Sequence, residues 1–388
     1  MRTQTKLEKK RATRGQTPIF FEFFAGGGMA RIGLGDRWRC AFANDFDPKK
    51  CAAYRANFGG KDLVETDIAT LTLDDLPDVR PDLVWASFPC QDLSLAGARG
   101  GITASRSGAF FPFWRLVEGL IEDNRAPKLI VLENVAGLLT SNGGGDFAAL
   151  AGLMTKRGYK VSTCVIDASQ FTPQSRPRLF ILGFGPGAGI PADTIAAQPP
   201  PALEAAIDAL PPRVRRNVAP ARTPHGPRSN IALKDIVDWN GGDWHPPAQT
   251  RKLIAMMNPQ QRRRLKSLMN SGKPIAGTGF RRMRTEKGKT VQRFEARFDG
   301  LAGCLRTPAG GSSRQVLIAI ENGKARTRLL NAREAARLMG LPDDYVLPEN
   351  ANAALKLCGD GVCPPVVQWL AAHILEPALF SVEARAAA

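Results

Sequence analysis

Residues 18–30 read Pro-Ile-Phe-Phe-Glu-Phe-Phe-Ala-Gly-Gly-Gly-Met-Ala. An apolar run ends in three glycines and a helix-like stretch begins at Met29, so the segment predicts a strand, a glycine turn and a helix. A turn without side chains lets a cofactor approach the backbone closely. The pattern Gly-x-Gly-x-x-Gly is not met from Gly26, because Arg31 takes its last position, so a tight structural turn is the alternative interpretation.

Further short apolar runs follow this turn and alternate with helix-like stretches. The candidate strands are 38–43, 82–88, 128–132, 160–166 and 179–184, and the candidate helices are 48–58, 110–123 and 146–157. This alternation predicts an α/β domain with a mostly parallel sheet. Ligands of such sheets bind beyond the carboxyl ends of the strands, where the glycine turn, Asp45 and Cys90 all fall.

The composition changes after the last of these strands. Residues 186–228 are rich in Pro, Ala and Gly, and helical patterns return at 332–339 and 366–375. We therefore expect three parts. They are a basic flexible tail at 1–14, a catalytic domain built from 15–190 and 326–388, and a smaller domain at 191–325.

The positive charge is concentrated in two places. The formal net charge is +17, of which residues 1–14 carry +5 and residues 201–300 carry +12. The rest of the chain is neutral overall, so the smaller domain is predicted to bind a polyanion.

Cysteine and histidine usage argues against a metal site. The seven cysteines are irregularly spaced without a Cys-x-x-Cys pair, and there are three histidines, so neither zinc nor a disulfide framework is expected. The pattern fits a reducing cytosol. We expect no signal peptide, because the basic start runs into a strand-like stretch, and no membrane span, because no apolar run approaches ~18 residues.

Polar side chains stand at the predicted strand ends. Asp45 lies about 20 residues beyond the glycine turn, the spacing at which a carboxylate accepts hydrogen bonds from ribose hydroxyls of NAD or S-adenosylmethionine. A helix cap is the alternative, but Asp47 before Pro48 fits that role better. Glu133 follows the run 129–132 and is interpreted as a catalytic group or a helix cap.

Cys90 is the candidate nucleophile. A cysteine is more often a small buried hydrophobe, but Pro89 imposes a turn at a strand mouth that would project this thiol outward. Its reactivity would require thiolate character from nearby dipoles or cations. Gln174, Arg176 and Arg178 alternate before another strand and would share one face of an extended segment, which suggests ligand contacts.

Together these pieces resemble the motifs of the bacterial cytosine-C5 DNA methyltransferase family in order and spacing, over 15–185 and 325–380. The matching pieces are Phe24-Ala25-Gly26-Gly27-Gly28, Asn44-Asp45, Thr66-Asp67-Ile68, Phe88-Pro89-Cys90-Gln91, Glu133-Asn134-Val135, Gln174-x-Arg176-x-Arg178 and residues 328–341. The resemblance implies a Rossmann-like class I methyltransferase domain with a target-recognition domain, the latter at 191–325.

The resemblance also implies residue roles. S-adenosylmethionine would be the methyl donor and S-adenosylhomocysteine the product, with no metal. The catalytic residues would be Cys90, Glu133, Arg176 and Arg178, with Cys90 adding to C6 of a flipped cytosine and Glu133 protonating N3. The cofactor residues would be Phe24, Ala25, Gly26, Gly28, Asp45, Phe46, Asp67, Ile68, Pro89, Asp360 and Val362. The DNA contacts would be Gln91, Ser94, Gln174, Arg281, Arg282 and Arg284.

One position departs from the family's pattern. The last motif usually reads Gly-Asn-x-Val, whereas this chain has Gly359-Asp360-Gly361-Val362. Aspartate keeps an acceptor oxygen but loses the amide donor.

Three other functions are alternatives for this sequence. An NAD-linked oxidoreductase would share the glycine turn and Asp45, but it leaves Cys90, Glu133 and the basic block unexplained. A tRNA cytosine methyltransferase would share the motifs, and fourteen arginines among the twenty basic residues of 201–300 favour double-stranded DNA over it. A silent DNA-binding protein would not need a nucleophile and an acid. We expect a bacterial, cytoplasmic, nucleoid-associated enzyme, with a cognate restriction endonuclease as a separate partner.

Overall fold

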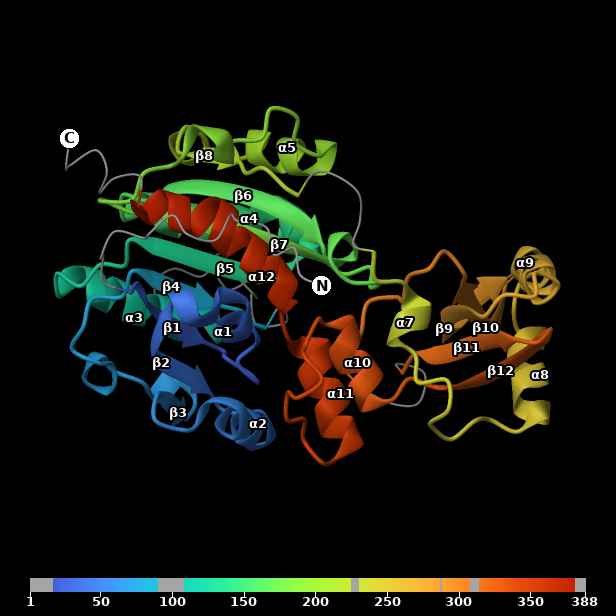
Figure 1. The fold of residues 1–388 in the computed structure, drawn as a ribbon. Coiled ribbons are helices and arrows are strands. Elements are labelled where there is room, and N and C mark those ends of the chain that lie inside the picture. Colours follow the sequence, from blue (N-terminus) through green and yellow to red (C-terminus); the bar gives the residue numbers. More distant parts are fainter. Residues whose placement is uncertain (1–16, 90–107, 225–229, 287, 308–313, 381–388) are drawn as a thin grey trace, which may run out of the picture.

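The computed structural model describes residues 17–89, 108–224, 230–286, 288–307 and 314–380. The expected tail and three predicted site residues, Cys90, Gln91 and Ser94, lie outside these ranges. A larger sheet with helices on both faces stands beside a smaller sheet, and α10 (Ala332–Leu338) and α11 (Ala351–Asp360) lie between them (Figure 1). Within the described ranges, no helix is both long and apolar enough to cross a membrane.

In the described part of the chain, eight strands form the larger sheet in the order β3-β2-β1-β4-β5-β7-β6-β8. Their bounds are β1 Ile19–Phe23, β2 Arg39–Asp45, β3 Leu63–Glu65, β4 Leu83–Ala86, β5 Leu129–Val135, β6 Lys160–Asp167, β7 Pro177–Phe184 and β8 Val218–Pro220. Strands β1 to β5 pair in parallel, and β7 runs antiparallel to both of its neighbours. The predicted α/β fold with a mostly parallel sheet is confirmed.

Helices cover both faces of this sheet, which explains why its strands are apolar on both sides. The helices are α1 Met29–Leu34, α2 Pro48–Phe58, α3 Phe110–Glu122, α4 Gly145–Lys156 and α12 Pro364–Leu370, which continues as a π-helical turn at Ala371–Leu375. Phe20 packs in one core cluster with α1 and α12, whereas Phe21 and Phe23 pack in the other with α3 and α4. The C-terminal segment therefore returns to complete the first domain.

Residues 201–220 lie with the larger sheet, although the sequence predicts them in the smaller domain. β8 pairs with β6 in parallel, and α5 (Pro201–Asp208) buries Leu203 and Ile207 in the core cluster of α3 and α4. Helix α6 (Pro212–Arg215) follows α5. The proline-rich composition marks a change in the direction of the chain, but the apolar side chains of this segment still pack against the larger sheet.

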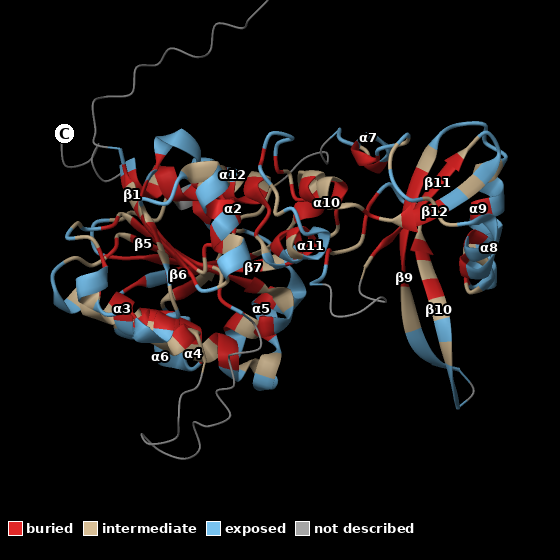
Figure 2. Ribbon diagram, turned by 90° about the horizontal axis from the view of Figure 1, so that it is seen from below, coloured by how far each residue is buried: buried red, intermediate tan, exposed pale blue. Residues whose placement is uncertain are grey.

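The smaller sheet is antiparallel and, in the described residues, has the strand order β10-β9-β11-β12. The strands are β9 Ile275–Glu286, β10 Lys289–Arg297, β11 Val316–Glu321 and β12 Lys324–Leu329, and the nearby helices are α7 Leu233–Ile236, α8 Pro247–Ala255 and α9 Pro259–Met269. Leu253, Leu265 and Phe294 pack α8 and α9 onto one sheet face. The β9–β10 hairpin extends beyond the other strands as an exposed ribbon (Figure 2).

Candidate functional site

The three glycines of the turn after β1 have different structural roles. A Cβ on Gly27 would lie 2.3 Å from the Tyr345 hydroxyl, and one on Gly28 would lie 2.3 Å from the Phe58 ring, so these positions are needed for close packing. The nearest atom to a Cβ on Gly26 is Lys50 Cδ at 4.0 Å, and its φ is +56°. Gly26 therefore leaves an open stretch of backbone at the end of β1, as a bound cofactor would require.

Asp45 at the end of β2 holds this turn. Its Oδ2 accepts a hydrogen bond from Gly26 N at 2.8 Å, and its Oδ1 accepts one from Asp47 N at 2.9 Å. Asp47 itself caps α2 by accepting from Lys49 N and Lys50 N, as the sequence predicts. Each carboxylate oxygen of Asp45 retains a second lone pair, so the residue can shape the turn and still accept from a ligand.

The other predicted cofactor residues surround the same strand ends. Phe46 is 67% exposed, which is unusual for a large aromatic ring and suits stacking on a planar base. Asp67 is exposed and caps a short turn by accepting from Ala69 N, and Ile68 is buried beneath it. An open turn, a carboxylate and an exposed ring together fit an adenosyl group.

The end of α11 closes this region. Asp360 Oδ2 lies 2.8 Å from Lys50 Nζ, and Asp360 Oδ1 accepts from the Thr307 hydroxyl at 2.5 Å. Val362 is buried. The aspartate that departs from the family pattern thus joins α2 to the segment that enters the smaller domain.

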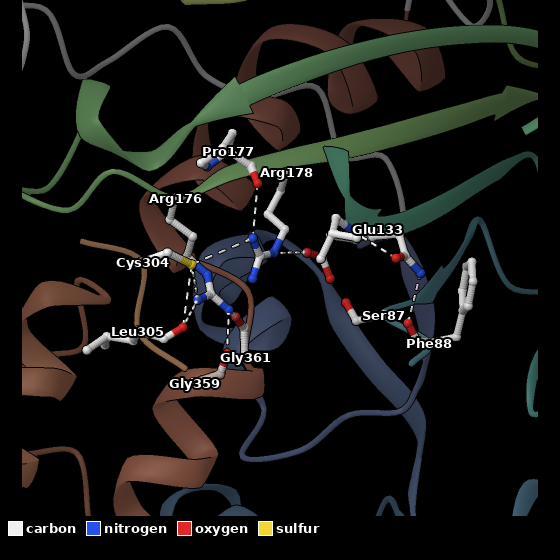
Figure 3. Close-up of polar contacts among 12 residues, drawn as sticks. Ser87, Phe88, Glu133, Arg176, Pro177, Arg178, Cys304, Leu305, Gly359 and Gly361 are labelled. Atoms are coloured by element: carbon white, nitrogen blue, oxygen red, sulfur yellow. Dashed lines mark hydrogen bonds and ion pairs between the residues drawn. The ribbon is translucent and has the colours of Figure 1, made fainter. Parts of the chain in front are cut away.

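A second group of side chains lies at the ends of β4, β5 and β7. Glu133 is 5% exposed, and its Oε1 lies 3.2 Å from Arg178 Nε (Figure 3). Asn134 Nδ2 donates to Phe88 O at 3.0 Å, which fixes the segment after β4 beside Glu133. Pro89 is exposed at the end of this segment, and the described range stops there, one residue before Cys90 in the sequence.

Gln174 and Arg176 point into the protein rather than toward a ligand. Gln174 is fully buried, donates to Leu338 O at 2.9 Å and accepts from Leu305 N at 3.1 Å. The expected contact of Gln174 with DNA does not fit this burial. Arg176 donates through Nη2 to Gly359 O at 2.8 Å and to Gly361 O at 2.7 Å.

Arg176 is 1% exposed, and burial, followed by repulsion from Arg178, lowers the pKa of its guanidinium. Its contacts with carbonyl oxygens indicate a positioning role, in contrast to the partly exposed Arg178. Arg176 and Arg178 therefore have different roles, although their spacing in the sequence predicts the same role for both.

Cys304 is a residue of this site that sequence reasoning missed. Its Sγ lies 3.4 Å from Arg176 Nη1 and 4.0 Å from Arg178 Nη1, and it is the half-exposed cysteine among those described. Asn134 and Lys50 were also missed as site residues. Asn134 could have been singled out beside Glu133, whereas Cys304 carries no local signal. In the described ranges, no three His, Cys, Asp or Glu side chains gather as a metal site would require.

Comparison with known proteins agrees with this geometry. The sequence model of the family described as C-5 cytosine-specific DNA methylase matches residues 19–376. The chain is similar to the Type II methyltransferase M.NlaX of Neisseria lactamica, with 28% identity over 94% of this chain and 98% of the relative. M.HhaI of Haemophilus parahaemolyticus is 27% identical over 92% and 93%. The crystal structure of the S. pombe Dnmt2 methyltransferase shares the fold, with a TM-score of 0.58, 17% identity and coverage of 93% and 98%.

Proposed function

The chain belongs to the C-5 cytosine-specific DNA methylase family, and on this premise we propose that it methylates C5 of a flipped cytosine in a specific double-stranded DNA sequence through a covalent adduct with Cys90. The family makes it a DNA cytosine-5-methyltransferase. A stacked cytosine exposes neither ring face, so the base has to leave the helix before it reacts. A tRNA substrate is not favoured, because the matching family is described by its action on DNA.

In the proposed mechanism, the Cys90 thiolate adds to C6 while Glu133, in its acid form, protonates N3. A neutral pyrimidine resists attack at C6 unless N3 is protonated as the bond forms. The addition makes C5 nucleophilic enough to accept a methyl group. C5 then loses its proton to solvent, the C6–S bond breaks to return the thiolate, and N3 returns its proton to Glu133.

S-adenosylmethionine would supply the methyl group as an electrophile. We assign its binding to the open backbone at Gly26 with Phe24 and Ala25, to Asp45 for the ribose and to the exposed Phe46 ring for the adenine, with Gly28, Asp67, Ile68, Pro89 and Val362 shaping the pocket. No metal takes part in this scheme.

The observation that carries the proposal is the Glu133 and Arg178 pair beside the segment that leads to Cys90. The 3.2 Å contact fixes the carboxylate, and the bond from Asn134 to Phe88 O holds the two strand ends together. Arg178 is assigned to the cytosine O2 as well as to Glu133. Arg176 is assigned to positioning, because carbonyl oxygens surround its guanidinium.

We also propose a division into two domains that follows the two sheets. The described residues of 17–222 and 330–380 would form the catalytic domain, and the described residues of 230–329 would form the target-recognition domain. The first differs from the sequence expectation by including β8, and the second by including the whole of β12. A cognate restriction endonuclease would act at the same DNA site as a separate protein.

Bisulfite sequencing of DNA from bacteria that express the chain tests the function. Methylated cytosines should occur in one short sequence context and be absent from cells that express Cys90→Ala. Methylation in no preferred context would contradict the sequence-specific part of the proposal, and its complete absence would contradict the activity.

A further inference from the structure

The β9–β10 ribbon presents two different faces. Directly opposed residues of an antiparallel pair share a face, and residues two apart along a strand share it too. Phe280, Arg282 and Arg284 of β9 therefore lie on the same face as their partners Glu295, Arg293 and Val291 of β10. Arg281 and Met283 lie on the other face with Phe294 and Gln292.

The face that carries Phe280 has two arginines gathered on a single carboxylate. Arg282 Nε lies 3.1 Å from Glu295 Oε2, and Arg284 Nε donates to Glu295 Oε1 at 2.5 Å. Arg284 Nη2 also contacts Glu295 Oε1, so the carboxylate takes the Nε–Nη2 edge of Arg284 and the Nε of Arg282. The Nη1–Nη2 edge of Arg282, whose side chain is 36% exposed, remains directed away from this contact.

The same face continues toward the candidate catalytic site. The Arg306 guanidinium stacks on the Phe280 ring at 5.6 Å, and Arg282 does so at 5.7 Å. Arg282, Arg284 and Arg306 line one groove with Phe280, and Arg281 also borders this groove. Arg306 directly follows Leu305, whose carbonyl accepts from Arg176, so the groove leads to the side chains around Glu133.

The opposite face is directed elsewhere. Phe294 is fully buried in the cluster with Leu253 of α8 and Leu265 of α9. Arg281 lies in a second groove with His245 and Lys252, beside α8. Arg281 thus borders both grooves, whereas Arg282 and Arg284 line the groove that contains Phe280.

We propose, on the basis of the proposed function, that the Phe280 face of the ribbon enters the DNA major groove and reads guanine through Arg282 and Arg284, with Glu295 as the residue that positions both guanidinium groups. The major groove admits a two-stranded ribbon, and guanine O6 and N7 match the planar fork of arginine. Glu295 contributes by ordering two flexible side chains before DNA binds.

This role gives Glu295→Gln an unusual signature. The substitution removes one negative charge from a DNA-facing surface, so affinity for arbitrary duplex DNA should stay equal or rise. It also releases two arginines, so the preference for the cognate sequence should fall by about 10-fold. A merely structural role of Glu295 would lower both quantities together.

The test uses the full chain and a pool of duplexes with randomised sequence around one cytosine. The pool is methylated with S-adenosylmethionine and sequenced after bisulfite treatment, and affinity for an unrelated duplex is measured at several salt concentrations. Arg282→Ala and Arg284→Ala should each lower the preference at a guanine position by about 5- to 150-fold, the discrimination of one bidentate pair. Arg281→Ala should leave the preferred sequence unchanged.

Glu321→Gln is the matched control, because Glu321 pairs with Arg326 at 3.4 Å on the far strands of the same small sheet. It makes the same charge change and should not alter sequence preference. If the wild-type chain methylates no DNA, the proposed function fails. If the wild type is sequence-specific but Glu295→Gln, Arg282→Ala and Arg284→Ala keep the same preference, or Glu295→Gln weakens all binding, this inference alone is overturned.

Discussion

Arg178 Nε lies 3.2 Å from Glu133 Oε1, with side chains that are 15% and 6% exposed. In the pairing of β5 with β7, Val135 rather than Glu133 is directly opposite Arg178, so the arginine reaches along the strands to meet the carboxylate. The contact places one acid and one cation side by side where β5 ends and the antiparallel β7 begins. Substitutions here should therefore affect the chemical step rather than the binding of DNA.

Glu133→Gln should slow the chemical step by on the order of 10²-fold or more, because the amide cannot protonate N3. DNA affinity should remain close to that of the wild type, since the glutamine amide keeps the size of the side chain and can still donate a hydrogen bond to N3. Single-turnover methylation and a binding titration separate these quantities.

Glu118→Gln is the matched control for this change. Glu118 accepts from Arg157 Nε at 2.8 Å on the outer face of the molecule, so the same loss of a carboxylate should leave the rate unchanged. If Glu133→Gln instead loses DNA binding and keeps the single-turnover rate, Glu133 is a structural residue.

Cys90→Ala should abolish methylation, because it removes the thiol that the proposed mechanism adds to C6. DNA that carries 5-fluorocytosine should trap the wild-type chain as a covalent complex, since fluorine cannot leave as a proton does. Denaturing electrophoresis reports the complex. Cys164→Ala removes a buried thiol of β6 and should still form it; methylation by Cys90→Ala would refute the assignment.

Asp45→Ala should weaken S-adenosylmethionine binding more than DNA binding. The substitution removes the acceptor for the ribose and also frees Gly26 N, which loosens the turn beneath the donor. Isothermal titration with each ligand measures the two affinities. Asp47→Ala removes the neighbouring cap of α2 and should lower stability by ~1 kcal/mol without this selectivity. Equal losses of both affinities in Asp45→Ala would indicate misfolding.

Asp360→Asn should have a small effect on stability. The ion pair with Lys50 is partly exposed, so its loss should lower the free energy of unfolding by about 0.2 to 1 kcal/mol, with less effect at high salt. Urea unfolding at two salt concentrations checks this. Lys356→Met breaks the neighbouring pair with Asp47 between the same helices and serves as the comparison. A loss above ~3 kcal/mol would contradict the view that Asp360 contributes only a partly exposed ion pair.

The sequence predicts the larger sheet well because local signals agree with the tertiary structure. Helix α2 spans the predicted 48–58, since Asp47 and Pro48 begin it and Gly59 follows it. The smaller sheet is not predicted from the sequence. The β9–β10 ribbon contains many charged residues, so it lacks the regular alternation of apolar and polar residues that identifies a strand. Gln174 and Arg176 share a spacing with Arg178, but spacing cannot reveal that protein backbone covers that face.

Glu22 on β1 is a buried acid that the proposed mechanism does not use. It is 2% exposed, and among the described contacts its Oε2 has no hydrogen-bond partner. Burial raises its pKa from 4.5 to about 8, although Arg31 and the backbone N–H groups of Ala30 and Arg31 oppose this shift. The folded protein therefore holds a proton on Glu22 across a pH range in which the unfolded chain has lost it.

The free energy of unfolding should consequently fall as pH rises from 4.5 to about 8, and this contribution should level off above that range. Its slope is at most about 1.36 kcal/mol per pH unit for one proton. Glu22→Gln is neutral at every pH, so its stability relative to the wild type should increase across the same window. Urea unfolding of both proteins between about pH 5 and 9 measures the difference, and a difference that stays constant with pH would show that the Glu22 carboxyl is not held protonated by the fold.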